Sequence, residues 1–423
     1  MGKIDINKLL PLSVLLIFTF FLNCDRDATQ SIFVEEPTAK PDPIISSINP
    51  PDKTLAGIGN ITITGQNFSA SLDENAVFFD GVQAINVSAS ATELIVESPN
   101  LPGDSLEVKV NVAGSFLFSN TAYYNLESAL QRHSEIGIEL EDVYGITADR
   151  NENVFVSISR DASGTARRVD RILPDGTREK GWGSQTFLFA NHMRIGPGDL
   201  LYLTRNTTSL YTIEPGGGNR SSIFARIAGR GYDLDFNQEG SMYTAGNGDS
   251  LYLVQTNGDF ESVAGYPSTF VRGVRVFGDH VYVAGTEGGT RDAVWRNRIN
   301  TVNDLGANEL VIDVTANIGD SEIQALTFAE DGDMYISITN NDDPIWIVQP
   351  DGSAEPLYPG VIKPADADII EVRDMVWGND VFMYINRFHQ VEEQGPDGPE
   401  VTTFQQIIKV NMQKLGALYW GRE

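Results

Sequence analysis

Cysteine and histidine are scarce in this sequence of 423 residues: Cys24 is the only cysteine, and there are four histidines. A single cysteine excludes a disulfide within one chain, so the folded domains must be stabilised by burial alone. Because the histidines are not clustered in the sequence, a metal site of the His/Cys type is not expected.

Positive charge is also low. The chain has 30 Lys and Arg residues against 58 Asp and Glu residues, which gives a formal net charge of −28. This balance argues against binding of nucleic acid, or of an anionic lipid surface, through a basic face. The acidity favours solubility, and a dispersed cation-binding role is the alternative. The nucleophile-elbow motif, the P-loop and a glycine-rich loop between a strand and a helix are all missing.

Long apolar runs are missing apart from one near the start. Leu9–Leu22 is a mostly apolar run of 14 residues that follows Lys3 and Lys8. It is short for a membrane span and has the length and flanking charge of a signal peptide. Asn23 and Cys24 come directly after it. A lone cysteine in this position resembles the lipobox of bacterial lipoproteins, in which the mature chain starts at the cysteine that carries the lipid.

This resemblance implies a signal peptide over residues 1–23, lipidation of Cys24 and attachment to a membrane through the lipid. It implies the bacterial cell envelope as the location, with the outer membrane as the membrane expected. The alternative is an ordinary secretory signal with an incidental cysteine. Residues 24–42 are rich in acidic residues, proline, threonine and serine, without a sustained hydrophobic period, which predicts a flexible tether.

Short alternating strands separated by turns fill residues 43–126 and predict a small antiparallel sandwich. The segments Pro43–Pro50, Ile61–Phe68 (ITITGQNF) and Val77–Gly81 resemble the IPT/TIG immunoglobulin-like domain. The resemblance implies a spacer or contact module without catalytic residues. Within ITITGQNF, Gly65 permits a bend, the next asparagine can cap it, and the phenylalanine can plug the end of the sandwich.

Residues 127–423 contain a repeat. In the segment Ile323–Gly352, Leu326 and Phe328 alternate with polar neighbours, and a Gly-Asp turn leads into a second strand and then a third. Six such units occur, with the aromatic residue of the second strand at spacings of 47, 41, 39, 53 and 47 residues. Those aromatic residues are Phe155, Tyr202, Tyr243, Tyr282, Tyr335 and Phe382.

Six small antiparallel sheets of about 45 residues each are typical of a β-propeller, because each sheet buries both faces only when the sheets stack in a ring. The predicted fold class is therefore all-β, with an immunoglobulin-like sandwich followed by a six-bladed propeller over residues 127–423. The repeat pattern resembles NHL-repeat and SMP-30-like six-bladed propellers.

Ring closure has two candidate strands. Glu135–Leu140 lies just before the first inner strand, in the place that Thr186–Ala190 and Ser222–Ile227 take as outer strands of other units. We expect it to complete the sixth blade, although the C-terminal stretch Ala417–Trp420 could compete for that role. The acidic insertion Arg387–Thr403 contains proline and glycine, and we expect it to form a surface loop.

Propellers usually bind ligands at the mouth of the central channel, near the starts of the inner strands. Aligning the six units places nine polar or aromatic side chains there. They are Tyr144, Asn191, His192, Tyr232, Asp233, Arg272, Gln324, Arg373 and Asp374. Tyrosine faces stack against sugars, and arginine and aspartate form charge-assisted hydrogen bonds, so this set is typical of a site for a polar ligand. The alternative is that these residues are solvated turns or pair with one another across the channel.

The resemblance to SMP-30-like lactonases implies a metal site at the channel mouth, because those enzymes hold a divalent cation there with Glu, Asn and Asp. The matching positions here offer Asn191, Asp233 and Asp374 but no glutamate. Three oxygens could hold Ca²⁺ together with water, whereas the missing glutamate argues against lactonase activity. No other cofactor is expected.

We therefore predict an envelope-anchored, non-enzymatic lipoprotein whose propeller binds a glycan or an envelope protein. The layout resembles cell-surface lipoproteins of Bacteroidota-like bacteria, some of which are linked to polysaccharide uptake. One alternative is a metal-dependent hydrolase or lactonase acting at the channel mouth. Another is a scaffold subunit of an outer-membrane complex.

Overall fold

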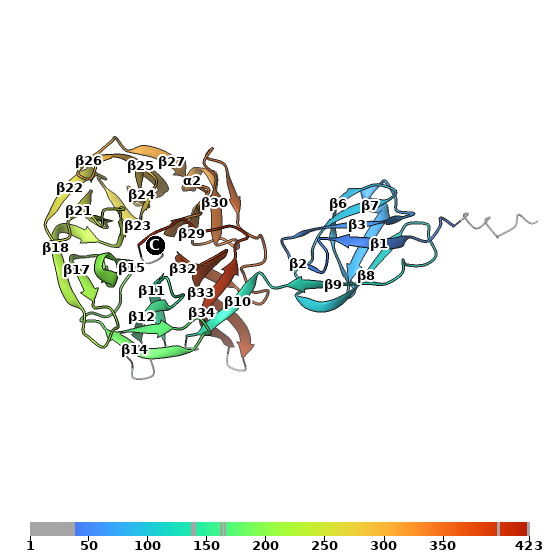
Figure 1. Cartoon of the computed structure of the whole chain (residues 1–423), viewed down its shortest axis with the longest axis horizontal. Helices are drawn as coiled ribbons and strands as arrows, with labels where there is room; N and C mark the ends of the chain where they lie inside the picture. Colours follow the sequence, from blue (N-terminus) through green and yellow to red (C-terminus); the bar gives the residue numbers. More distant parts are fainter. Residues whose placement is uncertain (1–38, 137–140, 161–163, 165, 396–397, 421–423) are drawn as a thin grey trace, which may run out of the picture. The chain divides into compact units, whose positions relative to one another are not determined.

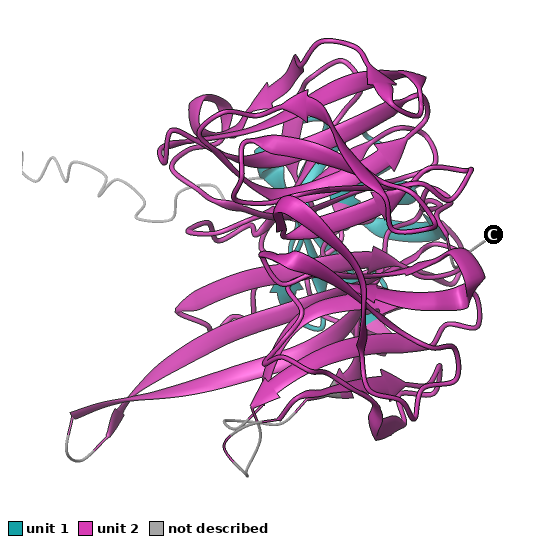
Figure 2. Ribbon diagram, turned by 90° about the vertical axis from the view of Figure 1, so that its left-hand side faces the viewer, with its two compact units in different colours: residues 1–49, 62–96, 107–122 teal, residues 50–61, 97–106, 123–423 magenta. Residues whose placement is uncertain are grey.

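The computed structural model describes residues 39–136, 141–160, 164, 166–395 and 398–420. Two compact units divide the chain: one comprises residues 1–49, 62–96 and 107–122, and the other comprises residues 50–61, 97–106 and 123–423 (Figure 2). The described part of the chain contains three short helical segments: η2 (Leu72–Glu74), η3 (Pro197–Asp199) and α2 (Val314–Asn317). No helix among these residues is long and apolar enough to span a membrane.

The immunoglobulin-like sandwich consists of two sheets. One has the strand order β1 (Ile44–Asn49), β3 (Asn60–Gln66), β7 (Glu93–Glu97), β6 (Ile85–Ala89). The other has the order β2 (Lys53–Leu55), β9 (Ala122–Glu127), β8 (Gly103–Val112), β4 (Asn75–Phe79), β5 (Val82–Gln83). Burial alternates along β3, β7 and β8, as the alternating sequence predicts.

The predicted bend at the end of β3 is present. Phe68 is buried, and a Cβ on Gly65 would lie 2.4 Å from the Phe68 ring and 2.0 Å from the Ile44 carbonyl oxygen, so only glycine fits. Asn67 adopts a positive φ of 62°, and its side-chain amide donates to the carbonyl oxygen of Asp42 over 2.8 Å.

The propeller prediction is confirmed: six antiparallel sheets are arranged in a ring around a central axis (Figure 1). Blade 1 contains β11 (Asp142–Ala148), β12 (Val154–Arg160), β13 (Arg168–Ile172) and β14 (Arg178–Ser184). Blade 2 contains β15 (Met193–Gly196), β16 (Leu200–Leu203), β17 (Thr207–Ile213) and β18 (Ser222–Gly231). Blade 3 contains β19 (Asp233–Phe236), β20 (Met242–Ala245), β21 (Ser250–Val254) and β22 (Phe260–Gly265).

The other three blades follow the same order from the channel outward. Blade 4 contains β23 (Thr269–Phe277), β24 (His280–Glu287), β25 (Arg291–Thr301) and β27 (Glu309–Asp313), and the short β26 (Asp304–Leu305) also pairs with β25. Blade 5 contains β28 (Ile323–Phe328), β29 (Met334–Ile338), β30 (Ile345–Val348) and β31 (Ala354–Pro356). Blade 6 contains β32 (Ile369–Trp377), β33 (Phe382–Gly395), β34 (Gly398–Asn411) and β10 (Leu130–Glu135).

Blade 6 closes the ring, because its outermost strand comes from the start of the propeller segment. Strand β10 pairs antiparallel with β34, from Leu130 opposite Val410 to Glu135 opposite Gln406. The closing strand therefore ends where Glu135–Leu140 was expected to begin, and residues 137–140 lie outside the described part. Among the other outer strands, Ser222–Ile227 is confirmed within β18, whereas the outer strand of blade 1 is Arg178–Ser184 and not Thr186–Ala190.

Two further expectations are wrong. Arg387–Thr403 is not a loop: β33 and β34 run through it as one long hairpin, paired from Phe382 opposite Asn411 out to Gly395 opposite Gly398. Ala417–Trp420 does not join a blade as a strand. Instead, the backbone N–H of Ala417 donates to the Phe328 carbonyl oxygen over 3.0 Å, and the segment continues toward the centre of the ring (Figure 1).

A mostly buried carboxylate, that of Glu152, links blades 1 and 6 at their seam. Glu152, in the turn before β12, accepts hydrogen bonds from the Tyr384 hydroxyl (2.9 Å), the Lys409 ammonium (3.0 Å) and the Asn379 backbone N–H. Burial raises the pKa of Glu152, but these donors lower it by more, so the net pKa lies below its ordinary value of 4.5. The ionised form of Glu152 is therefore favoured by folding.

We expect Glu152→Ala to lower the free energy of unfolding by about 2–4 kcal/mol near neutral pH, because it leaves Lys409 and Tyr384 without their partner in a mostly buried seam. Since the folded-state pKa of Glu152 is lowered, its contribution is fully present above pH 4.5 and is lost as the pH falls through the folded-state value. Urea unfolding of both proteins at several pH values measures this.

The matched control is Glu179→Ala in the same blade, which removes an exposed ion pair of 2.6 Å with Arg171. It should cost less than about 1 kcal/mol. Equal losses for the two variants would show that Glu152 does not hold the seam.

Candidate functional site

Two layers of side chains from the six inner strands line the propeller channel. The first layer contains Gly145, His192, Asp233, Gly273, Ala325 and Asp374, and all six are buried. The second layer lies two residues further along each strand and contains Thr147, Arg194, Asp235, Arg275, Thr327 and Val376, also all buried. The spacing of two is what a strand requires for side chains that share one face.

The first layer brings together three of the predicted site residues from three blades. The His192 Nδ1 atom lies 3.2 Å from Asp374 Oδ1 and 3.8 Å from Asp233 Oδ1. All three side chains are almost completely buried. The expected convergence of these residues is thus present, but inside the channel and out of contact with solvent.

Both aspartates link neighbouring blades. The Asp374 carboxylate accepts the backbone N–H of Ile146 in blade 1 over 2.8 Å and that of Met375 over 2.9 Å. The Asp233 carboxylate accepts the backbone N–H of Val274 in blade 4 over 3.0 Å and the Arg275 guanidinium over 2.6 Å. These carboxylates therefore act as structural acceptors between blades.

This hydrogen bonding argues against the expected Ca²⁺ site formed by Asn191, Asp233 and Asp374. The carboxylate oxygens are already engaged by N–H donors, and the guanidinium groups of Arg194 and Arg275 lie 3.6 Å and 2.6 Å from Asp233. Nearby cations disfavour a further divalent cation. Among the residues that the structure describes, no group of three or more His, Cys, Asp or Glu has the geometry to hold a metal ion.

The buried ionisable groups perturb one another. Burial lowers the pKa of His192, but Asp233 and Asp374 raise it by more, so the net pKa lies above 6.5. Burial raises the pKa of Asp235 to about 7, although Arg194 and the N–H of Val276 lower it in part. The channel thus favours a protonated histidine and a carboxyl group that is partly protonated near neutral pH.

The mouth at the starts of the inner strands carries half-buried aromatic rings and arginines. Tyr144 stacks on Phe189, with 3.9 Å between ring centroids and 13° between planes. The Arg373 guanidinium lies over the rings of Phe388 (4.1 Å) and Tyr144 (5.9 Å), and its Nε is 3.2 Å from Glu371. This group, called the Tyr144 patch below, joins blades 1 and 6.

A second group at the same mouth involves blades 3 and 4. Tyr232 meets Phe270 edge to face at 5.2 Å, and the Arg272 guanidinium lies 4.6 Å from the centroid of the same Phe270 ring. Arg272 also pairs with Glu322 at 3.1 Å. Burial raises the pKa of Tyr232, while Arg272 and the Asn191 side chain lower it in part. Tyr232 therefore stays a neutral hydrogen-bonding group at ordinary pH.

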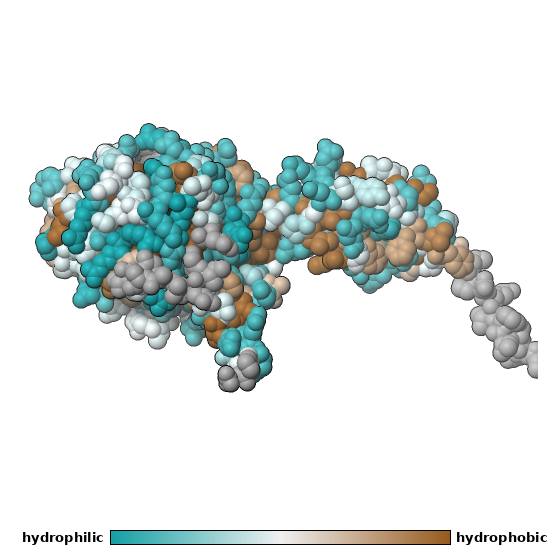
Figure 3. Space-filling view, turned by 90° about the horizontal axis from the view of Figure 1, so that it is seen from below, coloured by the Kyte–Doolittle hydropathy of each residue, from teal (hydrophilic) through white to brown (hydrophobic). Residues whose placement is uncertain are grey.

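A groove of about 500 Å³ continues from the Tyr144 patch along the base of the β33–β34 hairpin. Its walls are Glu141, Asp142, Arg160, Phe388, Gln390, Val401, Thr403 and Gln405. Phe388 belongs to both the groove and the patch. Most of the propeller surface seen in Figure 3 is hydrophilic, and hydrophobic residues gather on the projecting hairpin.

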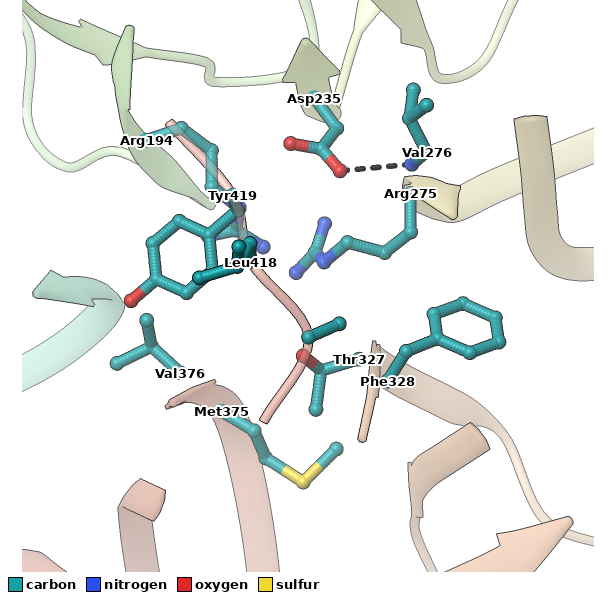
Figure 4. Close-up of a pocket in the computed structure, with 11 residues that line it drawn as sticks. Arg194, Asp235, Arg275, Val276, Thr327, Phe328, Met375, Val376, Leu418 and Tyr419 are labelled. Atoms are coloured by element: carbon teal, nitrogen blue, oxygen red, sulfur yellow. Dashed lines mark hydrogen bonds between the residues drawn. The ribbon is translucent and has the colours of Figure 1, made fainter. Parts of the chain in front are cut away.

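The opposite mouth is covered by the C-terminal segment. The Tyr419 hydroxyl donates to the Trp377 carbonyl oxygen, and Trp420 Nε1 donates to the Asn237 carbonyl oxygen over 2.7 Å. Leu418 and Tyr419 lie across the channel, against the second layer of side chains (Figure 4). An extended ligand therefore has access from the mouth at the starts of the inner strands.

Eight of the nine predicted site residues thus fall into three sets. Tyr144 and Arg373 form one part of the mouth, Asn191, Tyr232 and Arg272 form another, and His192, Asp233 and Asp374 lie inside the channel. Gln324 is half-buried at the start of β28 and has no contact with the other eight among the described interactions. The residues that the sequence reasoning missed are Phe189, Phe270, Phe388, Arg194, Asp235 and Arg275. The last three follow the aligned positions by two residues, and that spacing could have identified them.

Comparison with known proteins agrees with this architecture. Residues 43–125 match the IPT/TIG domain family. None of the curated proteins compared with the chain matches it.

Several solved structures are similar. An auxiliary nutrient binding protein from Bacteroides thetaiotaomicron has a TM-score of 0.50 at 12% identity, over 88% of this chain and 97% of that chain. One from Bacteroides ovatus has a TM-score of 0.49 at 11% identity, over 87% and 98%. The calcium-binding protein regucalcin from Agrobacterium tumefaciens has a TM-score of 0.46 at 13% identity, over 68% and 98%. At 12% identity the likeness to the Bacteroides thetaiotaomicron structure concerns the fold alone.

We expect the stability of the protein to fall as the pH rises from about 4 to about 7, in part because of Asp235. Its folded-state pKa is about 7 against an ordinary value of 3.8, so in that range the folded state binds more protons than the unfolded state. His192 acts in the same direction: its contribution is fully present below pH 6.5 and is lost as the pH rises through its raised folded-state pKa.

Asp235→Asn should remove the first contribution, because the amide resembles the protonated acid. The free energy of unfolding of the variant should therefore depend less on pH, by at most about 1.4 kcal/mol per pH unit. Urea titrations at about pH 5 and about pH 7 test this. Parallel pH dependences of wild type and variant would contradict it.

Proposed function

We propose that this protein is a binding protein of the bacterial cell envelope and that its propeller captures an oligosaccharide. The ligand lies on the Tyr144 patch and extends into the groove beside the β33–β34 hairpin. The observation that carries the proposal is Phe388, because it belongs to both the stacked patch and a groove of about 500 Å³.

The chemistry of the site suits a sugar. The half-buried Phe388 ring lines the groove, where it can stack on the C–H surface of a pyranose ring. The groove adds carboxylate, guanidinium, amide and hydroxyl groups, which can hydrogen-bond sugar hydroxyls in both directions. Its volume lies within the range of about 300–1,000 Å³ found for small-molecule sites.

The N-terminal part of the chain supports a place in the envelope. We propose that residues 1–23 are a lipoprotein signal peptide, that Cys24 carries the lipid and that residues 24–42 tether the domain of residues 43–126 and the propeller of residues 127–423. Residues 1–38 lie outside the described part of the structure. The similar Bacteroides thetaiotaomicron structure is of a protein described as an auxiliary nutrient binding protein, and we infer the same broad role here.

We expect Phe388→Ala to weaken binding of the captured oligosaccharide at least about tenfold, because it removes the ring shared by patch and groove. A glycan array identifies the ligand, and calorimetry then measures the Kd for each variant. The matched control is Phe260→Ala on the outer strand of blade 3, where the ring is 41% exposed and distant from the mouth, and it should bind as the wild type does. Binding of no glycan by the wild type, or an unchanged Kd for Phe388→Ala, would refute the site.

Lipidation is tested separately. We expect Cys24→Ala to move the protein from the membrane fraction to the soluble fraction, because the single cysteine is the only attachment point for the lipid. Detergent phase partitioning of cell extracts measures this. Unchanged partitioning into the detergent phase would contradict the lipid anchor while leaving the glycan site untouched.

A further inference from the structure

A small cavity lies at the base of the channel, between the second layer of side chains and the C-terminal segment (Figure 4). Its volume is about 30 Å³. Its walls come from the inner strands of blades 2 to 6 and from residues 417–419. The polar lining comes from Arg194, Asp235, Arg275, Thr327 and Tyr419.

Two buried guanidinium groups direct unused donors into this cavity. Arg194 is 4% exposed and Arg275 is 6% exposed. The Nη1 atom of each donates to the carbonyl oxygen of the preceding residue over 2.5 Å. The Nη2 atom of each is buried and has no hydrogen-bond partner among the described residues. A buried cationic donor without a partner is costly, so this pair requires an acceptor.

The carboxylates of the channel do not accept hydrogen bonds from these two Nη2 atoms. Asp233 and Asp374 are engaged by backbone N–H groups and by Arg275 and His192, and Arg194 Nη2 stays 3.6 Å from Asp233. Asp235 lies on the cavity wall and accepts the Val276 N–H over 2.8 Å.

The charges of the channel also favour a negatively charged ligand in the cavity. The cationic groups that face it are Arg194, Arg275 and protonated His192, and the fully engaged anionic groups are Asp233 and Asp374. Burial raises the pKa of Asp235 to about 7, so this carboxyl group is partly neutral near neutral pH. With Asp235 neutral, no residue in the cavity wall carries a negative charge, whereas Arg194 and Arg275 carry positive charges, so a monovalent anion between them is favoured.

We propose that this cavity binds one halide-sized anion, chloride in ordinary buffers, between the Nη2 groups of Arg194 and Arg275. The size of the cavity sets the class of ligand: about 30 Å³ accommodates one or two water-sized bodies, which excludes sulfate, phosphate and organic acids. The apolar walls formed by Phe328, Met375 and Leu418 favour a weakly hydrated ion.

The C-terminal segment would retain the anion. Leu418 and Tyr419 cover the cavity, and hydrogen bonds from Tyr419 to Trp377 and from Trp420 to Asn237 hold the segment against blades 6 and 3. The bound ion would join guanidinium groups of blades 2 and 4 at the end of the channel opposite the proposed glycan site. This inference does not depend on the proposed function.

Anomalous scattering gives the direct test. Crystals of the full chain grown without chloride and soaked in sodium bromide should show one anomalous peak between the two arginines. In solution, the Tm of protein dialysed into sodium gluconate should rise by several degrees, and saturably, when chloride or bromide replaces gluconate at constant ionic strength. No bromide peak at this place, with water only between the arginines, would overturn the proposal, as would equal Tm values in all salts.

Variants assign the effect to the site. Arg194→Gln should abolish the halide-dependent part of the Tm shift, whereas Arg298→Gln, which changes an arginine with a 66% exposed side chain, should retain it. Arg275→Gln also removes the contact with Asp233, so Arg194→Gln is the primary variant. If Arg194→Gln does not fold, the bromide peak in the wild-type crystal still decides. An unchanged halide effect in folded Arg194→Gln would refute the site.

Discussion

The propeller depends on buried carboxylates of one blade that accept backbone N–H groups of the next. Asp374 binds the N–H of Ile146 across the seam between blades 6 and 1, and Asp292 binds that of Ile323 from blade 4 to blade 5. Asp233 and Asp235 both bind blade 4 from blade 3. Stacked blades share no continuous backbone ladder at these points, so each side-chain acceptor satisfies a donor that would otherwise be buried alone.

This constraint explains the charge pattern of the channel. Carboxylates placed for the blade contacts lose their hydration, and His192, Arg194 and Arg275 compensate for their charge from neighbouring strands. Among the described channel residues, three side-chain nitrogen atoms are buried without a hydrogen-bond partner: His192 Nδ1, which lies 3.2 Å from Asp374, and the Nη2 atoms of Arg194 and Arg275. The residues inside the channel are thus committed to the fold, and the residues left for an extended ligand are the rings and arginines at the open mouth.

Sequence reasoning reached the architecture because its signals are periodic. The six aromatic residues at spacings near 45, together with alternation within each strand, identify six blades, and aligning them places His192, Asp233 and Asp374 on one axis. It failed where periodicity stops. The closing strand LQRHSE has a weaker apolar pattern than the neighbouring EIGIEL, so the prediction was shifted by about five residues along the chain. The hairpin beyond Arg387 contains many acidic residues together with proline and glycine, so its sequence resembles a loop, although its described residues pair out to Gly395 opposite Gly398.

Phe189, Phe270 and Phe388 were missed for a different reason. Each lies outside the aligned positions and reaches the mouth through tertiary packing: Phe189 on Tyr144, Phe270 on Tyr232 and Phe388 under Arg373. Phe189 and Phe270 share an offset, two residues before the aligned pairs of units 2 and 4, but no aromatic residue stands at that offset in the other four units. Phe388 lies on the second strand of blade 6. Segments that are present in only some of the blades make a propeller depart from a symmetric ring. The largest departure in this chain, the long hairpin of blade 6, stands beside the Tyr144 patch at the seam where the first and last blades meet.

The groove at this seam is formed by segments more than 200 residues apart in sequence, as the 2.7 Å hydrogen bond from the Val143 N–H to Gln405 illustrates. The groove walls therefore come together only when the ring is closed, so ring closure is a precondition for the proposed binding site.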